Sequence, residues 1–348
     1  MVVGAALLLG CTGPEPPLPA PATQSAALVA RQTLREVHLG RGTAPVRPQV
    51  VLSASWGSGA GQLGKRDEAS RPGPMSLAVA DDGEIYVLDQ VNRRVLRHDA
   101  TGRLRVQIPI PSEATEDIVV VGQSLYALVY ESGAHPGYRV ERHAIDGSGC
   151  ITALTLPRSI QLVTGLFWTG PPAVPDLWVE QRHDIHTRVL HGDQALDLHT
   201  VLGRPDRRVV RSGPHSGERR LTVLRTGTRR ARVLQVEPPP EETTRPLLDV
   251  ATDEPLVAIQ ELESDAYGRI YLGLLLGEDG PDGLVRARKV MLVCCRDGTY
   301  RAVELFVQRA TDVFRPVVVD RQGRIYQLQT TEQGVTLWRW AASEGGVP

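Results

Sequence analysis

Apolar and polar residues alternate in short runs along most of the chain, and tight turns separate these runs. The clearest unit contains the apolar run 74–80, an Asp-Gly turn at 82–83, and alternating runs at 84–89, 92–99 and 102–104. Alternation with a period of two predicts β-strands, and Asp-Gly between two such runs predicts a tight turn. The unit therefore predicts a four-stranded antiparallel sheet whose strands follow one another in the chain.

Five degenerate copies of this unit follow the first. The equivalent positions, which we call anchors, are Tyr86, Tyr126, Trp178, Leu221, Tyr271 and Tyr326, and they are separated by 40, 52, 43, 50 and 55 residues. Four-stranded repeats at such intervals are typical of β-propeller blades joined by loops of variable length. The pattern predicts an all-β, six-bladed β-propeller with four-stranded antiparallel blades. Copies one, five and six share a specific motif, whereas copies two to four rest on the alternation alone.

The sixth copy ends before its fourth strand. After the apolar run at 335–341 only a short tail remains, so the outer edge of the last blade has no partner from the C-terminal side. An unpaired edge would expose backbone hydrogen-bonding groups. An unused strand at 49–56 precedes the first blade. We expect this strand to fill the outer position of blade six and close the ring.

The first copy resembles the NHL repeat in several positions. Pro74 precedes the first strand, a core of the form Asp-Gly-x-Ile-Tyr-Val-x-Asp occupies 82–89, and Asn-Arg-x-Val follows at 92–95. The glycine-rich segment 56–64 is similar to the lead-in of the same family. The resemblance implies an NHL-type six-bladed propeller. It also implies that Asp89, Asn92 and Arg93 have a structural role, in which their polar groups satisfy the backbone of the turn.

The N-terminus resembles a bacterial lipoprotein signal. Residues 2–10 form a short apolar run that ends in Leu-Leu-Gly before Cys11, as in a lipobox, which implies lipid attachment at Cys11. The run is too short for a transmembrane helix, and it lacks the positive region of a standard signal peptide. The proline-rich stretch at 12–21 predicts an extended spacer. The expected organisation is a lipoprotein signal peptide at 1–10, a Pro-rich linker at 11–46 and the propeller at 47–348.

Composition excludes some classes of function. The formal net charge is −1, so no overall field would draw the protein to nucleic acid. The other three cysteines are Cys150, Cys294 and Cys295. In an oxidising compartment Cys150 could pair with either of the others, and the sequence leaves this pattern open. Their spacing matches no zinc motif.

Three polar clusters are candidate sites. His183, His186, His191 and His199 match no standard metal spacing, so we predict an exposed polar hairpin there. Arginines are frequent from Arg204 to Arg232, without aromatic residues among them, which predicts solvated strand faces and turns; attraction of anionic lipid or a polyanion is the alternative. The acidic loop at 277–283 lacks the ligand pattern of an EF-hand, so we predict a long flexible hairpin.

The innermost strands bear on catalysis, because propeller enzymes bring carboxylates or histidines to the central channel. The expected inner strands are Leu77–Ala80, Ile118–Val121, Leu162–Leu166, Val209–Arg211, Val257–Gln260 and Val317–Val319, which are chiefly apolar. Because these strands contain few carboxylates and histidines, they argue against such an enzyme. The sequence also has no GxSxG motif, no P-loop, and no GxGxxG motif placed between a strand and a helix. We therefore predict no catalytic, cofactor-binding or metal-binding residue.

The sequence thus favours a lipid-anchored scaffold or binding propeller of the bacterial cell envelope, on the periplasmic or outer-membrane face. Its expected partners are other envelope proteins, in a larger assembly, and the membrane through the lipid. The loops at 131–138 and 273–288 are candidate contacts, since loops on a rigid scaffold often make the recognition surface. One fold hosts many functions. The alternative is a metal-dependent hydrolase or lyase, similar to the lactonases of this class, with its site at the channel mouth.

Overall fold

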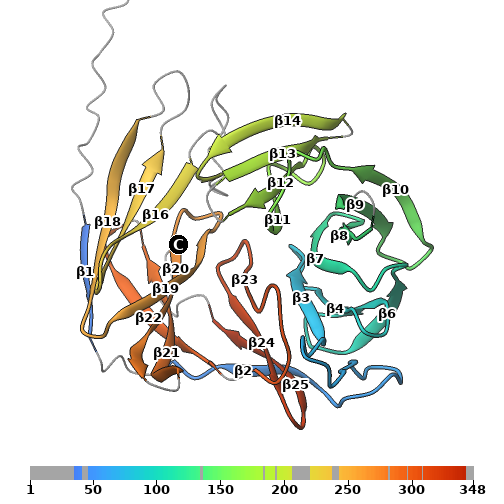
Figure 1. Ribbon diagram of the computed structural model, residues 1–348, viewed down its shortest axis with the longest axis horizontal. Coiled ribbons are helices and arrows are strands. Elements are labelled where there is room, and N and C mark those ends of the chain that lie inside the picture. The colour runs from blue at the N-terminus through green and yellow to red at the C-terminus, as the bar shows by residue number, and fades with distance from the viewer. Residues whose placement is uncertain are drawn as a thin grey trace, which may run out of the picture. The chain divides into compact units, whose positions relative to one another are not determined.

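The computed structural model describes residues 35–40, 46–133, 136–182, 185–192, 194–205, 220–236, 243–280, 283–295, 297–307 and 309–341. Within these ranges all the regular elements are strands, and they form six sheets. In Figure 1 the sheets follow one another around a common centre. The predicted all-β, six-bladed β-propeller is confirmed. No helix in the described part of the chain is long and apolar enough to cross a membrane.

The first three blades each contain four consecutive strands, ordered from the innermost to the outermost. Blade one has β3 (Pro74–Val79), β4 (Ile85–Asp89), β5 (Arg94–His98) and β6 (Leu104–Pro109). Blade two has β7 (Thr115–Val121), β8 (Ser124–Glu131), β9 (Gly137–Ala144) and β10 (Cys150–Thr155). Blade three has β11 (Val163–Thr169), β12 (Asp176–Gln181), β13 (Ile185–His191) and β14 (Gln194–Leu202).

The second half of the ring follows the same order. Blade four has β15 (Arg204–Pro205), β16 (Arg220–Gly227), β17 (Arg230–Val236) and β18 (Thr244–Thr252), with β1 (Arg35–Leu39) added outside. Blade five has β19 (Leu256–Ser264), β20 (Ile270–Gly280), β21 (Gly283–Cys294) and β22 (Tyr300–Leu305). Blade six has β23 (Val317–Val319), β24 (Ile325–Thr331), β25 (Gly334–Trp340) and, outermost, β2 (Gln49–Ala54).

All six anchor residues lie on the second strand of their blades, as the spacing predicts. A second strand has neighbours at both edges and other blades over both faces, so its side chains are buried whichever way they point. All five residues of β4 are buried. Tyr86 on this strand packs in one cluster with Ile118 and Leu125 of blade two. The anchors recur because every blade buries the same position against its neighbours.

The last blade meets the first at the inner radius, and β2 joins them at the outer edge. Among the innermost strands, β3 contacts β7, β7 contacts β11, β19 contacts β23, and β23 contacts β3 again. At the outer edge β2 pairs antiparallel with β25 and places Leu52 opposite Leu337. The Trp56 Nε1 group extends this contact by donating to the carbonyl of Thr331 at 3.0 Å. The predicted closure by the strand at 49–56 is confirmed, with pairing over 49–54 whose register shifts between Val50 and Leu52.

A further strand lies inside the segment expected to be linker. β1 pairs in parallel with β18, so the sheet of blade four has five strands. Val37 and Leu39 are 4% and 1% exposed and pack with residues of blades four and five. Alternation of apolar and polar residues over 35–39 accounts for this strand. Residues 35–39, expected to be part of the linker at 11–46, therefore belong to the propeller.

Polar side chains of the hairpin between β4 and β5 hold the glycine-rich segment in place. Asp89 accepts hydrogen bonds from the Gly64 amide at 2.9 Å and from Asn92 Nδ2 at 2.8 Å. Arg94 donates to the same carboxylate at 2.9 Å and to the carbonyl of Gln62 at 2.9 Å. The structural role expected for Asp89 and Asn92 is confirmed. The structural role expected for Arg93 is instead played by Arg94. Arg93 itself is exposed and pairs with Glu113.

The turns that follow the first strands of blades five and six interlock. Arg269 of blade five donates to the carbonyl of Gln322 in blade six at 2.6 Å. The Tyr271 hydroxyl bonds Asp265 at 2.7 Å and lies 3.2 Å from the carbonyl of Gly323. Gly323 has a φ of +81°, and a Cβ there would overlap the Tyr271 hydroxyl and lie 2.6 Å from the Asp265 carboxylate. Glycine is thus required twice, by its backbone conformation and by the close approach.

Gly323→Ala is accordingly expected to lower the free energy of unfolding by about 2 to 4 kcal/mol, from backbone strain and overpacking together. Chemical denaturation followed by tryptophan fluorescence measures this loss. Gly122→Ala is the matched control, because Gly122 occupies the corresponding turn of blade two with a φ of +56°, and a Cβ there would have nothing within 4 Å. The control should lose only about 1 kcal/mol. Equal losses at the two positions would show that the inter-blade contact is unimportant.

Candidate functional site

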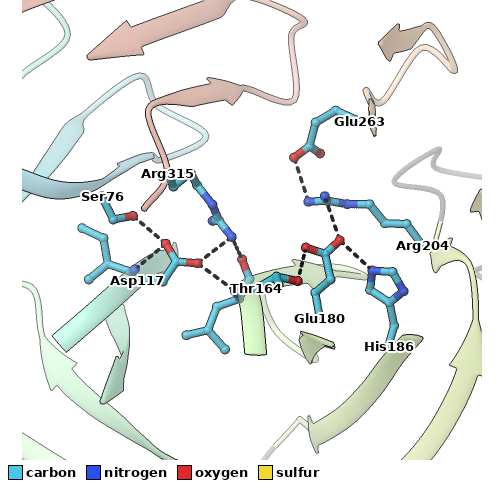
Figure 2. A network of polar contacts seen from close by, with 10 residues as sticks. Ser76, Asp117, Thr164, Glu180, His186, Arg204, Glu263 and Arg315 are labelled. Atoms are coloured by element: carbon cyan, nitrogen blue, oxygen red, sulfur yellow. Dashed lines mark hydrogen bonds and ion pairs between the residues drawn. The ribbon is translucent and has the colours of Figure 1, made fainter. Parts of the chain in front are cut away.

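Charged side chains cross the centre of the propeller, where the innermost strands meet. Figure 2 shows two groups in this network, one around Asp117 of β7 and one around Glu180 of β12. We call the whole set the channel network. It consists of Ser76, Asp117, Thr164, Glu180, His186, Arg204, Glu263 and Arg315.

Asp117 is fully buried and accepts from several blades at once. Its Oδ1 accepts from Ser76 Oγ at 2.5 Å and from its neighbour's amide, Ile118 N, at 2.9 Å. Its Oδ2 accepts from Leu166 N at 2.7 Å and pairs with Arg315 at 2.6 Å. Burial raises the pKa of the Asp117 carboxyl, although the Arg315 charge opposes this shift. One carboxylate therefore links blades one, two, three and six.

Glu180 is the centre of the second group. Its Oε2 accepts from Thr164 Oγ1 at 3.0 Å, and its Oε1 lies 3.1 Å from His186 Nε2 and 3.6 Å from an Arg204 nitrogen. Arg204 in turn bonds Glu263 of β19 at 2.7 Å. This group therefore joins blade three to blades four and five. Arg204 lies between two carboxylates, which offsets the cost of burying its charge.

The two groups approach each other around Gly165. A Cβ at this glycine would lie 2.9 Å from Arg315 Nη2 and 3.5 Å from Glu180 Oε2. Each carboxylate of the network faces an arginine, as a buried charge requires, and Arg204 serves two of them. Within the described ranges, the one set of three metal-donor side chains close enough to share an ion lies on the outer strands of blade two. The channel network is thus built to join blades.

The expectation that the inner strands are poor in carboxylates is wrong. β7 begins at Thr115 and includes Asp117, and β19 continues to Ser264 and includes Glu263. The predicted strands stopped where the apolar runs stop, whereas ion pairing across blades lets charged residues continue them. In blade four the inner strand expected at 209–211 lies outside the described residues, and the described one is β15.

A small pocket opens where β3, β7, β11 and β23 end, and we call it the mouth pocket. Its lining includes Val79, Val119, Trp168, Val319, Arg315 and Arg321. The Arg321 guanidinium lies over the Trp168 ring, 5.0 Å from its centroid. The cavity measures about 50 Å³. Small-molecule sites are typically about 300–1,000 Å³. The mouth pocket therefore suits a single side chain better than a substrate.

No protein-family model and no curated protein matches the sequence. Solved structures with a similar fold include a streptogramin B lyase, at 11% identity and a TM-score of 0.39, covering 76% of this chain and 92% of that one. BamB from Moraxella catarrhalis is 13% identical with a TM-score of 0.36, covering 86% and 96%. Virginiamycin B lyase from Staphylococcus aureus is 8% identical with a TM-score of 0.41, covering 79% and 96%. Likeness at this level carries no inference about activity.

A larger groove lies at the opposite end of β7, between blades two and three. It measures about 450 Å³, and we call it the tyrosine groove; it is lined by Tyr130, Pro136, Gly137, Tyr138, Arg158, Ile160, Gln161 and Leu162. The two tyrosine rings are 5.2 Å apart. Leu162 is 59% exposed and has a φ of +51°, a conformation that is uncommon for leucine. The described part of the loop at 131–138, a predicted contact, forms one side of the groove.

Glu116, at this end of β7, makes the folding stability of the protein depend on pH. Burial and the charge of Asp117 raise the pKa of Glu116 from its usual 4.5 to about 7. Between pH 4.5 and about 7 the folded chain binds more protons than the unfolded chain. The stability of the folded state therefore falls as the pH rises through this range. Glu116→Gln removes this effect. We expect the variant to gain roughly 1 kcal/mol on the wild type between pH 4.5 and 8, since the side chain keeps part of its hydration. Urea unfolding at several pH values tests this, and a constant difference would contradict the assignment.

The remaining predicted residues are distributed as follows. His186 is buried in the channel network, so the exposed hairpin predicted for the blade-three histidines is wrong at that position; His191 is exposed and pairs with Asp176 at 2.6 Å. His199 packs edge-on against Trp178. His183 and Cys11 lie outside the described residues. His186 is buried because Glu180 lies opposite it in the hairpin and accepts its hydrogen bond.

The predictions for the arginine stretch and for the acidic hairpin are each confirmed in part and wrong in part. Arg225, Arg229 and Arg230 are exposed as predicted, but Arg204 and Arg220 are not solvated, since the first lies in the channel network and the second is buried. The loop predicted at 273–288 is largely strand, because β20 and β21 pair as far as Gly280 and Gly283. No disulfide joins the described cysteines, Cys150, Cys294 and Cys295.

Proposed function

We propose that the chain is a lipid-anchored protein of the bacterial cell envelope, whose NHL-type propeller binds a partner protein at the tyrosine groove. The observation that supports this best is the groove itself, with two tyrosines beside an exposed leucine. Aromatic and arginine side chains are enriched at the centres of protein interfaces. Arg158 at the groove adds a charged group for orienting the partner.

The N-terminal sequence supports the envelope assignment. Cys11 follows a lipobox-like run, and the proline-rich stretch after it is suited to hold a folded domain away from a membrane. The NHL assignment has support from the Asp-x-x-Gly-Arg-Ile-Tyr sequence shared by 265–271 and 320–326, whose turns have the same Asp-to-backbone bonding. The rival hydrolase or lyase has less support, because the mouth pocket is small and the network charges are paired with one another.

Site-specific photocrosslinking in cells tests the docking surface. A photoreactive residue at Leu162 should capture one defined envelope protein, and Tyr138→Ser should reduce that product severalfold. The matched control is the same photoreactive residue at Tyr267, which is also highly exposed but lies in the turn between β19 and β20, on the face of the mouth pocket. The same product from both positions, or none from Leu162, would count against the groove.

The anchor requires a separate test. Cys11→Ser should move the protein from the membrane fraction to the soluble fraction after cell lysis, because lipid attachment needs the thiol. Crosslinking at Leu162 then shows whether the partner requires the anchor. Retention of the serine variant in membranes, without its partner, would contradict lipidation and leave the docking proposal standing.

A further inference from the structure

Three side chains with metal-ligating atoms converge at the outer edge of blade two. Glu141 and His143 are two residues apart on β9 and so lie on one face of that strand. Cys150, the first residue of β10, is paired directly opposite His143 across a tight turn. One donor atom from each residue lies within 4.8 Å of the other two. The hairpin geometry therefore brings together a carboxylate, an imidazole and a thiol.

The donor set matches one class of cation. Calcium and magnesium prefer oxygen ligands alone, whereas a thiolate with an imidazole is characteristic of zinc and its neighbours. A tetrahedral zinc with bonds of about 2.0 to 2.3 Å needs donors roughly 3.3 to 3.8 Å apart. The donors of Glu141 and His143, at 2.9 Å, would separate slightly, and any pair near the 4.8 Å limit of the set would move closer. A thiolate and a carboxylate would also balance the two positive charges of the ion.

Burial separates this set from an ordinary surface cluster. Glu141 is 3% exposed and His143 is 1% exposed, while Cys150 is exposed and leaves one side open to solvent. His143 Nε2 bonds Glu141 at 2.9 Å, but the buried Nδ1 of the same ring has no hydrogen-bond partner. An ion bound at Nε2 would replace the hydrogen bond to Glu141, and Nδ1 would then carry the proton of the neutral imidazole.

We propose that Glu141, His143 and Cys150 form a binding site for zinc or a closely similar divalent transition-metal ion, with solvent as the fourth ligand. Binding releases the thiol proton to solvent, and the ring proton moves from Nε2, which binds the ion, to Nδ1, so that the imidazole stays neutral. Arg139 stays on the other oxygen of Glu141, at 2.7 Å, and orients the carboxylate from outside the coordination sphere. The ion would fasten the edge strand β10 to β9.

Cobalt(II) titration of the reduced, untagged full-length protein tests the proposal, because cobalt bound to a thiolate has a charge-transfer absorption. The wild type should develop this band at one equivalent, and zinc should abolish it by competition. Cys150→Ser should lose the band. Glu141→Gln should keep the band but bind cobalt at least about tenfold more weakly. The wild type should also melt at a higher temperature with zinc than without it.

Cys295→Ser is the matched control, since Cys295 lies on blade five, away from the cluster, and Cys11 is common to every variant. It should behave like the wild type. A wild type without the band overturns the proposal, and so does a band that survives Cys150→Ser or disappears in Cys295→Ser. Thermal unfolding without metal should be alike in the wild type and both serine variants, which separates loss of a ligand from loss of the fold.

Discussion

Truncation of residues 1–54 is expected to abolish the cooperative unfolding transition of the propeller, or to shift it far toward lower denaturant. The truncated chain loses β2 and leaves β25 with an unpaired edge. It also loses Leu52, which is buried in one cluster with Leu337 and Tyr326. A buried leucine contributes about 2 to 5 kcal/mol and each ladder hydrogen bond about 1 kcal/mol. Their sum approaches the whole stability of a typical domain, about 5 to 15 kcal/mol.

Truncation of residues 1–45 is the matched control, because it removes the anchor region and β1 but keeps β2. This shorter deletion should retain a single cooperative transition, with a moderate loss from the removal of Val37 and Leu39. Urea unfolding followed by far-ultraviolet circular dichroism and tryptophan fluorescence compares the two. If both truncated chains unfold at the same urea concentration, β2 is not what closes the ring.

The sequence revealed the blades and their closure because those features are local or countable. Tyr86 and Tyr326 sit in nearly identical strand-turn-strand surroundings, so one copy identifies the other. The missing outer strand of blade six followed from counting strands, and 49–56 was an unused strand of the right length. Alternation and turn residues determine both features within a few neighbouring residues.

The channel network could not be predicted in the same way. Asp117 stands in a polar run that resembles the end of a loop, and its partner Arg315 is contributed by the opposite end of the propeller sequence. Only the closed ring brings the two together. The strand β1 presents the same difficulty, since its partner β18 pairs in parallel and lies far along the chain.

Two pairs of neighbouring polar side chains could have been predicted from the local sequence. Glu180 and His186 face each other across the turn between β12 and β13, in register. His143 and Cys150 do so across the turn between β9 and β10. Pairing the two sides of each predicted hairpin, residue by residue, would place both histidines beside their partners. Spacing rules taken from helices and zinc fingers do not apply to such cross-strand pairs.

Asp117→Ala should lower the free energy of unfolding by about 3 to 5 kcal/mol, because it leaves Arg315 as an uncompensated charge at the centre of the propeller. The backbone amide of Leu166 and the hydroxyl of Ser76 lose their acceptor in the same step. Urea unfolding at neutral pH measures the loss. Glu332→Ala is the control, since Glu332 pairs with Lys65 at 2.7 Å but is exposed. It should leave the midpoint almost unchanged.

The double variant Asp117→Ala with Arg315→Met separates the two causes of that loss. If the unpaired arginine charge dominates, removal of the guanidinium should restore a large part of the stability, since apolar replacement of a buried ion pair is often neutral. If the lost acceptor dominates, the double variant should be no more stable than Asp117→Ala alone. We expect substantial restoration, because Arg315 is mostly buried and its charge is matched by Asp117. A double variant that is less stable than the single one would mean that Arg315 stabilises the inner strands chiefly through its bond to the Leu166 carbonyl.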